Sequence, residues 1–241
     1  MSAATAERLI DDTDSAPNSA GLSPERVREL NAEFAPLHFE ERIRRLYELF
    51  APEDVLVTSS FAATSAYFLH IIHRIQPAQK VAFIDTGYHF QQTLEYKDYL
   101  SQLYGLEVFA LKAEDWKHQF TVDDRTWEKN PDFCCSVNKV EPLEAVKPHY
   151  RVWVSSLMAW QTDHRSDMEI FEVRRGILKF NPMIDVTRAD RDAYIREHQL
   201  PFHPLVAEGY QSIGCTHCTV KGSGRSGRWA GKPKTECGLH L

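Results

Sequence analysis

The amino-acid sequence predicts an α/β protein built on a mostly parallel sheet with helices on both of its faces. From about residue 50 onward, short runs rich in β-forming residues alternate with stretches of helical periodicity. Alternation of this kind is typical of parallel sheets that are covered on both faces. Apolar residues make up 43% of the 241 residues, which is enough to bury a full core.

Five runs predict strands, and each is short and mostly apolar. Because ligands in such sheets bind beyond the carboxyl ends of the strands, the segments that follow them are candidate binding loops. Three such loops stand out, namely residues 59–65, residues 85–89 and the segment after Val154. In chain order the predicted strands span residues 54–58 (DVLVT), 80–84 (KVAFI), 107–111 (EVFAL), 151–154 (RVWV) and 177–180 (ILKF).

Three stretches predict helices. Apolar residues recur at helical spacing over residues 66–75, and residues 90–104 form the next stretch. A third helix is predicted to start at Thr187, which would serve as its N-cap with Asp190 in the first turn. This helix is expected to end before Pro201.

Composition and charge exclude several classes of protein. The formal net charge is −6, whereas a general nucleic-acid binder needs a basic surface. No apolar run approaches the ~18 residues of a membrane span, and residues 1–27 carry acidic residues without the apolar centre of a signal peptide. We therefore expect residues 1–27 to be poorly ordered, and the protein to be cytoplasmic with no nucleic-acid or membrane partner. A homo-oligomer is compatible with the sequence, which does not fix the oligomeric state.

The end of the chain differs in composition from the rest. Beyond Pro204 the regular pattern fades into glycine-rich loops, and residues 219–234 contain Lys and Arg but no acidic residue. A basic, glycine-rich segment on an acidic protein indicates a local anion site on a mobile tail. We therefore expect an α/β domain over residues 28–218, followed by a flexible basic tail over residues 219–241.

The five cysteines point to metal binding or catalysis. Their number is odd and there is no export signal, so a disulfide framework is not expected. Cys215 and Cys218 form a C-x-x-C pair, and Cys134 and Cys135 supply two more thiols. Four thiolates suit either tetrahedral zinc or a [4Fe–4S] cluster, and the C-x-x-C spacing alone does not decide between them. Adjacent cysteines are unusual for structural zinc, which favours the cluster.

Cys237 stands apart from the other four. It is preceded by Arg225, Arg228, Lys232 and Lys234. Positive charge favours the thiolate, which is the nucleophilic form of cysteine. A tail thiolate in such surroundings could reach a substrate held at the sheet and later be exposed to a partner. The alternative is a tail cysteine with no role.

These motifs resemble those of the assimilatory sulfonucleotide reductases, in particular the iron–sulfur adenylyl-sulfate (APS) reductases, from about residue 28 to the end. The most specific match is E-C-G-L-H at residues 236–240, followed by the Cys134-Cys135 and Cys215-x-x-Cys218 pairs. Further matches lie at residues 83–87 (FIDTG), 139–143 (KVEPL), 181–182 (NP), 209–214 (GYQSIG) and 227–229 (GRW).

The resemblance implies a fold and a reaction. The fold would be adenine-nucleotide α-hydrolase-like, related to the ATP pyrophosphatases, with APS bound at the strand ends. Cys237 would attack the sulfur of APS, AMP would leave and an S-sulfocysteine would form. Thioredoxin, or a glutaredoxin-type dithiol, would then release sulfite for sulfate assimilation and cysteine biosynthesis. The [4Fe–4S] cluster would have a structural and electrostatic role.

The resemblance also assigns residues. The cluster ligands would be Cys134, Cys135, Cys215 and Cys218, and the catalytic residue would be Cys237. Ser59, Ser60 and Ser65 match the loop that cradles the phosphate end of the nucleotide, and Asp85, Thr86 and Gly87 match a segment lining its pocket. For this last segment, a plain strand-ending turn is the alternative. The residues that match phosphosulfate contacts are Lys139, Arg165, Arg225, Arg228 and His240.

The chain departs from the family pattern at four places. Ala62 stands where glycine is usual, which would be strained if the backbone there needs a positive φ. Asn138 replaces an arginine, and Val186 replaces a tryptophan. Residues 155–160 (SSLMAW) lack the usual glycine and arginine-rich run. These changes weaken the assignment of the substrate more than that of the chemistry.

Three alternatives follow. The first is the same reaction on the 3′-phosphorylated nucleotide PAPS, although PAPS-only relatives generally lack the four cluster cysteines. The second is a metal-binding relative without activity, against which the retained Cys237 argues. The third is an ATP-using adenylating enzyme of the same fold, which would need a Ser-Gly-Gly-type loop that this chain lacks.

Overall fold

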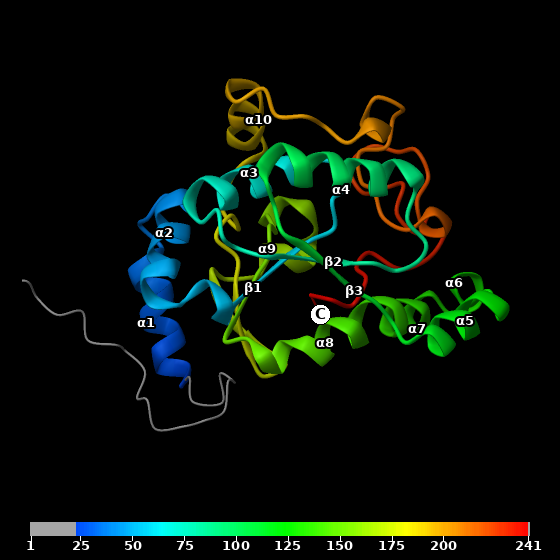
Figure 1. The fold of residues 1–241 in the computed structure, drawn as a ribbon, viewed down its shortest axis with the longest axis horizontal. Helices are drawn as coiled ribbons and strands as arrows, with labels where there is room; N and C mark the ends of the chain where they lie inside the picture. Colours follow the sequence, from blue (N-terminus) through cyan, green and yellow to red (C-terminus); the bar gives the residue numbers. More distant parts are fainter. Residues whose placement is uncertain (1–22, 241) are drawn as a thin grey trace, which may run out of the picture.

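The computed structural model describes residues 23–240, which fold around one six-stranded sheet (Figure 1). The strand order is β3-β2-β1-β4-β6-β5; the pair β5–β6 is antiparallel and the other neighbouring pairs are parallel. The predicted α/β class is therefore confirmed, and all five predicted strands are present. The strands are β1 Val55–Ser59, β2 Val81–Ile84, β3 Val108–Leu111, β4 Val152–Val154, β5 Phe171–Arg174 and β6 Ile177–Phe180.

The strand order reverses between β1 and β4. From β1 the chain proceeds outward through β2 to β3, and from β4 it proceeds to the other edge of the sheet. At such a reversal the connections leave the carboxyl ends of neighbouring strands in opposite directions, which opens a crevice. The topology therefore places the predicted loops after β1 and β4 at the two sides of one crevice.

One face of the sheet is covered by helices from both halves of the chain, and their apolar side chains form the main core. The helices predicted at residues 66–75 and 90–104 are present, and Thr187 accepts a hydrogen bond from the amide of Asp190 as the predicted N-cap. These helices are α1 Pro24–Phe34, α2 Phe39–Leu49, α3 Ser65–Ile75, α4 Gln91–Tyr104 and α10 Arg188–Glu197.

The helix α1 begins within the segment that the sequence analysis assigned to a poorly ordered N-terminus. Ser23 caps it by accepting a hydrogen bond from the amide of Arg26, and Pro24 is its first residue. Residues 24–27 are thus helical, whereas residues 1–22 lie outside the described part of the chain. Within residues 23–240, no helix has both the length and the apolar content of a membrane span.

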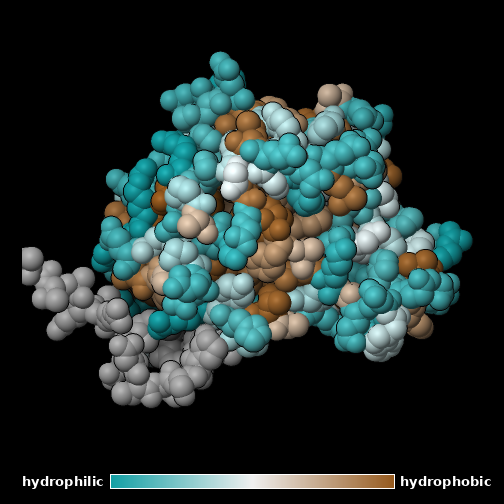
Figure 2. Space-filling view, viewed as in Figure 1, coloured by the Kyte–Doolittle hydropathy of each residue, from teal (hydrophilic) through white to brown (hydrophobic). Residues whose placement is uncertain are grey.

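The opposite face of the sheet carries α8 Glu141–Val146 and part of the C-terminal tail. Leu143 packs with Leu56, Ala82 and Trp153 in a second, smaller core, and Leu239 of the tail packs against it. Both faces are therefore covered, as predicted. In Figure 2, apolar side chains show at the centre of the molecule between the helices of the first face and α8.

A helical arm between β3 and α8 was not predicted from the sequence (Figure 1). In its first helix only Thr121 is buried, so there was no apolar stripe to detect. The arm consists of α5 Asp115–Asp123, α6 Thr126–Lys129, α7 Pro131–Cys135 and the π-helix η2 Ser136–Val140. The short segments elsewhere are η1 Pro52–Asp54, η3 Lys147–His149, η4 Ala159–Gln161, α9 Asp163–Ser166, η5 Pro204–Val206 and η6 Thr216–Cys218.

Candidate active site

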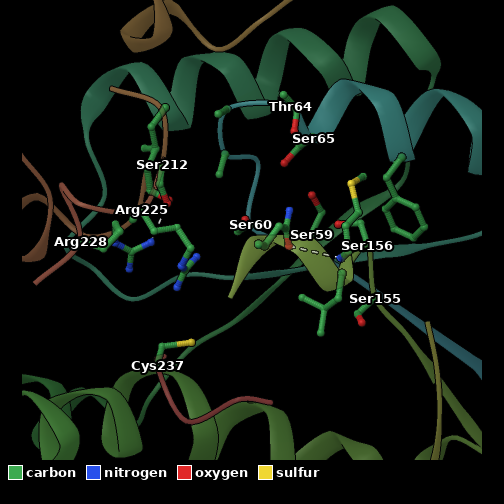
Figure 3. Close-up of a pocket in the computed structure, with 18 of the residues that line it drawn as sticks. Ser59, Ser60, Thr64, Ser65, Ser155, Ser156, Ser212, Arg225, Arg228 and Cys237 are labelled. Atoms are coloured by element: carbon green, nitrogen blue, oxygen red, sulfur yellow. Dashed lines mark hydrogen bonds between the residues drawn. The ribbon is translucent and has the colours of Figure 1, made fainter. Parts of the chain in front are cut away.

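A cavity of about 680 Å³ opens at the carboxyl ends of β1 and β4. Its walls include residues 58–65 after β1, residues 155–158 after β4 and parts of the tail between residues 224 and 240. Figure 3 shows Ser59, Ser60, Thr64 and Ser65 along one side, and the sulfur of Cys237 directed toward the cavity from the tail. Two of the three predicted loops therefore face each other across a pocket large enough for a nucleotide-sized ligand.

The loop after β1 owes its shape to Ser59 and Phe61. The hydroxyl of Ser59 accepts a hydrogen bond from the amide of Phe61 at 3.2 Å. Phe61 has φ +47°, and its ring is fully buried against Phe83, with centroids 5.6 Å apart. Ala62 does not have a positive φ. The anticipated condition for strain at Ala62 is therefore not met, and the unusual backbone conformation falls on Phe61, where core packing compensates for it.

The segment after β2 is only partly at the cavity. Thr86 lines it, with its hydroxyl 3.4 Å from the sulfur of Cys215. Asp85 and Gly87 are not among the lining residues; Asp85 accepts a hydrogen bond from the amide of Gly87 at 3.0 Å and pairs with Lys112 at 3.0 Å. Burial raises the pKa of Asp85, but these two partners leave it below its ordinary value. Asp85 and Gly87 thus form the strand-ending turn, and their expected place in the pocket is corrected.

Lys139 lies at the inner wall of the cavity. It belongs to the π-helix η2, which follows the two cysteines of α7, and it is 8% exposed. Burial lowers its pKa, but electrostatic interaction with Cys215, Cys135 and Cys237 more than offsets this and raises the pKa of Lys139 above its ordinary value. Lys139 is therefore a cation that adjoins both the paired cysteines and Cys237.

Arg225 and Arg228 approach the cavity from the first part of the tail (Figure 3). Arg225 donates to the carbonyl of Thr235 at 2.7 Å, and Arg228 donates to the carbonyl of Ile213 at 3.3 Å. Burial lowers the pKa of Arg225 to about 10, against the effect of Glu236. The Nε atoms of both arginines are buried and have no hydrogen-bond partner within the described chain. Unpaired cationic donors at a cavity indicate a site for an anion.

Arg165, although it lines the same cavity, is engaged with the tail. Its Nε donates to Oε1 of Glu236 at 2.7 Å and its Nη2 donates to Oε2 at 2.9 Å, and both side chains are buried. Burial raises the pKa of Glu236, but Arg165 holds it below its ordinary value. Of the predicted phosphosulfate contacts, Arg165 is thus the one that makes a bidentate pair with this buried carboxylate, whereas Arg225 approaches only Oε2, at 3.4 Å.

His240 is packed rather than frayed. Its ring lies parallel to that of Trp153, with centroids 5.2 Å apart and an angle of 9° between the planes. Its carbonyl oxygen lies 2.9 Å from Nε2 of His164. Burial lowers the pKa of His240 well below its ordinary value, and Lys179 and Arg165 add to this. The imidazole is therefore neutral near pH 7, and its Nδ1 is buried without a partner in the part of the chain described.

The four other cysteines come together at the base of the arm. Cys134 and Cys215 share a small buried cluster with Tyr88, against which Cys218 packs. Cys135 follows Cys134 in α7 and is 5% exposed. All five cysteines are free thiols.

The donor set of four cysteine thiols is compatible with an iron–sulfur cluster. Over residues 23–240, no three His, Cys, Asp or Glu side chains are arranged to hold one metal ion. Each cysteine of a [4Fe–4S] cluster binds a different iron, so its ligands need not converge on one point. Hydroxyl and amide groups also contact the sulfurs, as expected around a cluster. Thr86 lies 3.4 Å from the Cys215 sulfur, and Nδ2 of Asn138 lies 3.7 Å from the Cys134 sulfur.

Several residues at the site were not found by sequence reasoning. The sequence predicts Trp153 only as a strand residue, and nothing in the sequence shows that its ring stacks on that of His240. Glu236 belongs to the E-C-G-L-H motif, but its partner Arg165 is distant in the chain. Trp160 lines the cavity, and the guanidinium groups of Arg188 and Arg191 lie 4.6 and 4.9 Å from its ring centroid. These roles depend on contacts between distant segments, which a single sequence does not reveal.

Comparison with solved structures identifies the class of fold. The structure aligns with an FMN adenylyltransferase from Candida glabrata at a TM-score of 0.56 and 12% identity, over 84% of this chain and 69% of that one. It aligns with the phosphate complex of a phosphoadenylyl-sulfate (PAPS) reductase from Candida auris at a TM-score of 0.67 and 28% identity, over 83% of this chain and 98% of that one. The fold is thus that of the adenine-nucleotide α-hydrolase-like proteins, as expected.

The family follows from the sequence comparisons. Residues 54–221 match the phosphoadenosine phosphosulfate reductase domain, and the chain belongs to this family. An adenosine 5′-phosphosulfate reductase from Mesorhizobium japonicum is 38% identical over 232 residues, covering 94% of this chain and 88% of that protein. A phosphoadenosine 5′-phosphosulfate reductase from Gloeobacter violaceus is 34% identical over 223 residues, covering 83% and 92%. The resemblance seen in the motifs is confirmed, and the chain is an oxidoreductase that acts on a sulfur group.

Proposed function

We propose that this protein reduces adenylyl sulfate to sulfite and AMP, with Cys237 as the nucleophile, in the cytoplasmic assimilation of sulfate toward cysteine. The observation that carries the proposal is the position of Cys237. Its sulfur faces the cavity at the switch point of the sheet, beside Lys139 and the arginines 225 and 228 (Figure 3). A thiol on a tail that lines such a cavity is placed to attack a ligand bound there.

The chemistry follows from the groups around the cavity. The Cys237 thiolate attacks the sulfur of the sulfate group, an S–S bond forms, and the bond between sulfur and the phosphate oxygen breaks, so that AMP leaves with the electron pair. The nucleophile and the substrate are both anionic, so cations must offset their repulsion and stabilise the charge of the departing phosphate. Lys139 and the unpaired donors of Arg225 and Arg228 supply this charge.

The product of this step is an S-sulfocysteine, which a dithiol must resolve. One thiolate of a thioredoxin- or glutaredoxin-type partner attacks the sulfur of Cys237, sulfite leaves, and the second thiol of the partner closes a disulfide and frees Cys237. We propose that the tail moves to expose Cys237 for this step. Residues 219–240 contain no α-helix or sheet strand, and the end of the tail around Cys237 contacts the domain through side chains such as Glu236 and His240, which is compatible with such movement.

Cys134, Cys135, Cys215 and Cys218 would hold the [4Fe–4S] cluster. When bound, the cluster supplies a fixed charge distribution and ties the arm to the segment around η6. Lys139 follows Cys135 in one continuous helical segment. The placement of this lysine at the cavity therefore depends on the same segment that carries two of the ligands.

The choice of nucleotide rests on these cysteines. The four thiols favour APS, because PAPS-only members of the family generally lack them. The same reaction on PAPS is the second candidate, since relatives and a similar structure are named as PAPS reductases. The differences from the family pattern at Ala62 and Asn138 do not support the alternative of a metal-binding relative without activity. Ala62 does not have a positive φ, and Asn138 is fully hydrogen-bonded.

Mass spectrometry of the intact protein tests the proposal. The purified protein is mixed with APS, or separately with PAPS, without any reductant. We expect a gain of one SO₃ group on Cys237 with APS, and no gain in the Cys237→Ser variant. A larger adduct yield with PAPS than with APS would transfer the proposal to the phosphorylated nucleotide. The absence of any adduct with either nucleotide would refute the mechanism.

A further inference from the structure

Glu236, the residue before Cys237, is the most tightly held side chain of the tail. It is 4% exposed, although the neighbouring residue Thr235 is exposed. Its Oε1 accepts hydrogen bonds from Arg165 at 2.7 Å and from the hydroxyl of Thr162 at 2.9 Å. Its Oε2 accepts from Arg165 at 2.9 Å and from Arg225 at 3.4 Å. A carboxylate buried with this many donors is a specific anchor, because it would be costly to bury without them.

Two of the partners of Glu236, Arg165 and Thr162, belong to the α/β domain, whereas Arg225 lies in the tail itself. Arg165 lies in the short helix α9 and Thr162 immediately precedes it, in the segment that follows β4. Arg165 is 7% exposed, and its Nη1 also donates to Gln161. The guanidinium therefore belongs to a fixed element of the domain, and its bidentate geometry fixes the direction of the carboxylate as well as its position.

A second contact holds the other side of Cys237. His240 stacks on Trp153, and His164, which adjoins Arg165 in α9, contacts the His240 carbonyl at 2.9 Å. The thiol is thus held between two anchors, one residue before it and three residues after it. Only the first of these anchors is ionic.

The cavity stays open while these contacts are made. Glu236, Cys237 and His240 are all among its lining residues, and its volume of about 680 Å³ is measured with the tail in place. The carboxylate of Glu236 therefore does not occupy the space needed by a nucleotide. The docked tail is a conformation in which substrate can be present and Cys237 can face it.

We propose that Glu236 and Arg165 form a latch that holds Cys237 in its attacking position, and that this latch must open before a dithiol partner can reach Cys237. The inference rests on the proposed role of Cys237 and deepens it. It changes the expected role of Arg165. Three of its N–H groups are directed at Glu236 and Gln161, so it acts as a positioning residue for the tail and not as a contact to the phosphosulfate group.

The test measures how readily Cys237 reacts with iodoacetamide in the purified, cluster-containing protein without nucleotide. Peptide mapping separates modification at Cys237 from that at the other cysteines. Glu236→Gln keeps the size of the side chain but removes its charge. Because a charge-assisted hydrogen bond contributes about 1.5–3 kcal/mol and 1.4 kcal/mol corresponds to a factor of ten, the rate should rise roughly tenfold or more. Thr162→Val, which removes one neutral donor, should raise it about two- to fivefold.

Glu208→Gln is the matched control, because Glu208 is exposed and lies outside the latch; its rate should equal that of the unmodified sequence. Equal rates for Glu236→Gln and Glu208→Gln, with the same thermal unfolding, would overturn the latch. If Glu236→Gln does not fold, Thr162→Val provides the test instead. A rate of Cys237 modification in Thr162→Val no higher than in Glu208→Gln would then overturn the latch. This readout needs no substrate, so it can fail while the sulfur adduct on Cys237 still forms.

Steady-state kinetics separates positioning from substrate binding. If Arg165 positions the tail, Arg165→Lys and Glu236→Gln should lower kcat with little change in the KM for the nucleotide, and the lysine, which keeps the charge, should retain more of kcat than Arg165→Gln. A raised KM with unchanged kcat in Arg165→Lys would instead make Arg165 a substrate contact.

Discussion

The imidazole of His240 lies parallel to the indole of Trp153, with the ring centroids 5.2 Å apart. Trp153 is a buried residue of β4, and its Nε1 donates to the hydroxyl of Thr58 in the neighbouring strand at 2.8 Å. Two lysines, Lys147 and Lys179, lie 5.7 and 5.2 Å from the centroid of the same indole. The sheet thus offers the end of the chain a fixed aromatic surface, and the position of the tail depends on it.

The stack predicts how the tail responds to changes at His240. An aromatic pair contributes about 0.5–1.5 kcal/mol beyond its burial, so His240→Ala should release the tail end, whereas His240→Phe should keep it docked. Trypsin cleavage after Lys234 measures this, since Lys234 precedes the docked residues. We expect cleavage to be about two- to tenfold faster in His240→Ala and close to the unmodified rate in His240→Phe. Equal rates in both variants would show that the stack does not hold the tail.

Asn138 is adapted to its own neighbours rather than to the family pattern. It is 2% exposed; its Oδ1 lies 2.8 Å from Nδ1 of His118, and its Nδ2 donates to the Cys134 carbonyl at 3.0 Å and to Thr121 at 3.1 Å. An arginine has more donors and greater volume than this site can accommodate. Restoring the usual residue by Asn138→Arg should therefore destabilise the arm by about 2–4 kcal/mol and lower the iron content that the proposed cluster would give. Denaturant unfolding and iron analysis check this, and unchanged values would contradict it.

Much of the scaffold could be predicted, because its signals are local. The strands predicted at residues 177–180 and 151–154 are mostly apolar runs between more polar segments. Thr187 caps α10 by accepting a hydrogen bond from the amide of Asp190, which is only three residues away in the chain. The arm could not be predicted in the same way. In α5 only Thr121 is buried, so the helix shows no apolar stripe, and β5 is a four-residue edge strand with two charged side chains.

The site was less predictable than the scaffold. A sequence motif identifies the residue types at a site, but it does not identify the side chains that each of them contacts. Motif matching selected Cys237 and the residues that line the cavity with it, such as Lys139. It could not show that the guanidinium of Arg165 is bound to Glu236, or that Asp85 pairs with Lys112 outside the cavity. Both facts depend on which charged groups meet in three dimensions, and the sequence alone does not contain that distance information.

Arg42 and Asp185 predict a pH-dependent contribution to stability. Arg42 is 2% exposed and donates to both carboxylate oxygens of Asp185, at 2.6 and 2.7 Å, and also to the carbonyls of Phe34, Ala35 and Pro182. Burial raises the pKa of Asp185, but Arg42 leaves it below its ordinary value. When the pKa of a carboxyl group is lower in the folded than in the unfolded chain, the ionised group stabilises the fold. This contribution is complete at pH values above the pKa in the unfolded chain, about 3.9, and is lost as the pH falls through the lower pKa of the folded chain.

Asp185→Asn should therefore lower the free energy of unfolding at pH 7 by about 1 kcal/mol, since the Asp185 side chain is 59% exposed and solvent screens the pair. The difference between the two proteins should shrink as the pH is lowered below about 4. Arg42→Met should cost more, about 3–5 kcal/mol, because it also leaves two buried carbonyls and one part-buried carbonyl without their donor. Urea unfolding at pH 7, 5 and 3.5 gives these values. A deficit of Asp185→Asn that grows toward acid pH would reverse the assigned sign.

Gly227 controls the approach of Arg228 to the cavity. The amide of Val220 donates to the carbonyl of Gly227 at 2.9 Å, and a Cβ at position 227 would lie 2.1 Å from the carbonyl oxygen of Val220. That neighbour is backbone and cannot rotate away, so Gly227→Ala must displace the loop that carries Arg228 and its unpaired Nε. Since Arg228 is one of the cations facing the bound phosphate in the proposed reaction, AMP should bind roughly tenfold more weakly, as expected for one charge-assisted hydrogen bond.

Gly105→Ala is the matched control, because Gly105 has φ +60° with no atom within 4 Å of an added Cβ and terminates α4 away from the cavity. That variant should lose about 1 kcal/mol of stability through backbone strain but keep its affinity for AMP. Calorimetric titration of both variants with AMP decides the question: equal dissociation constants would mean that the close contact between Gly227 and Val220 does not determine where Arg228 lies.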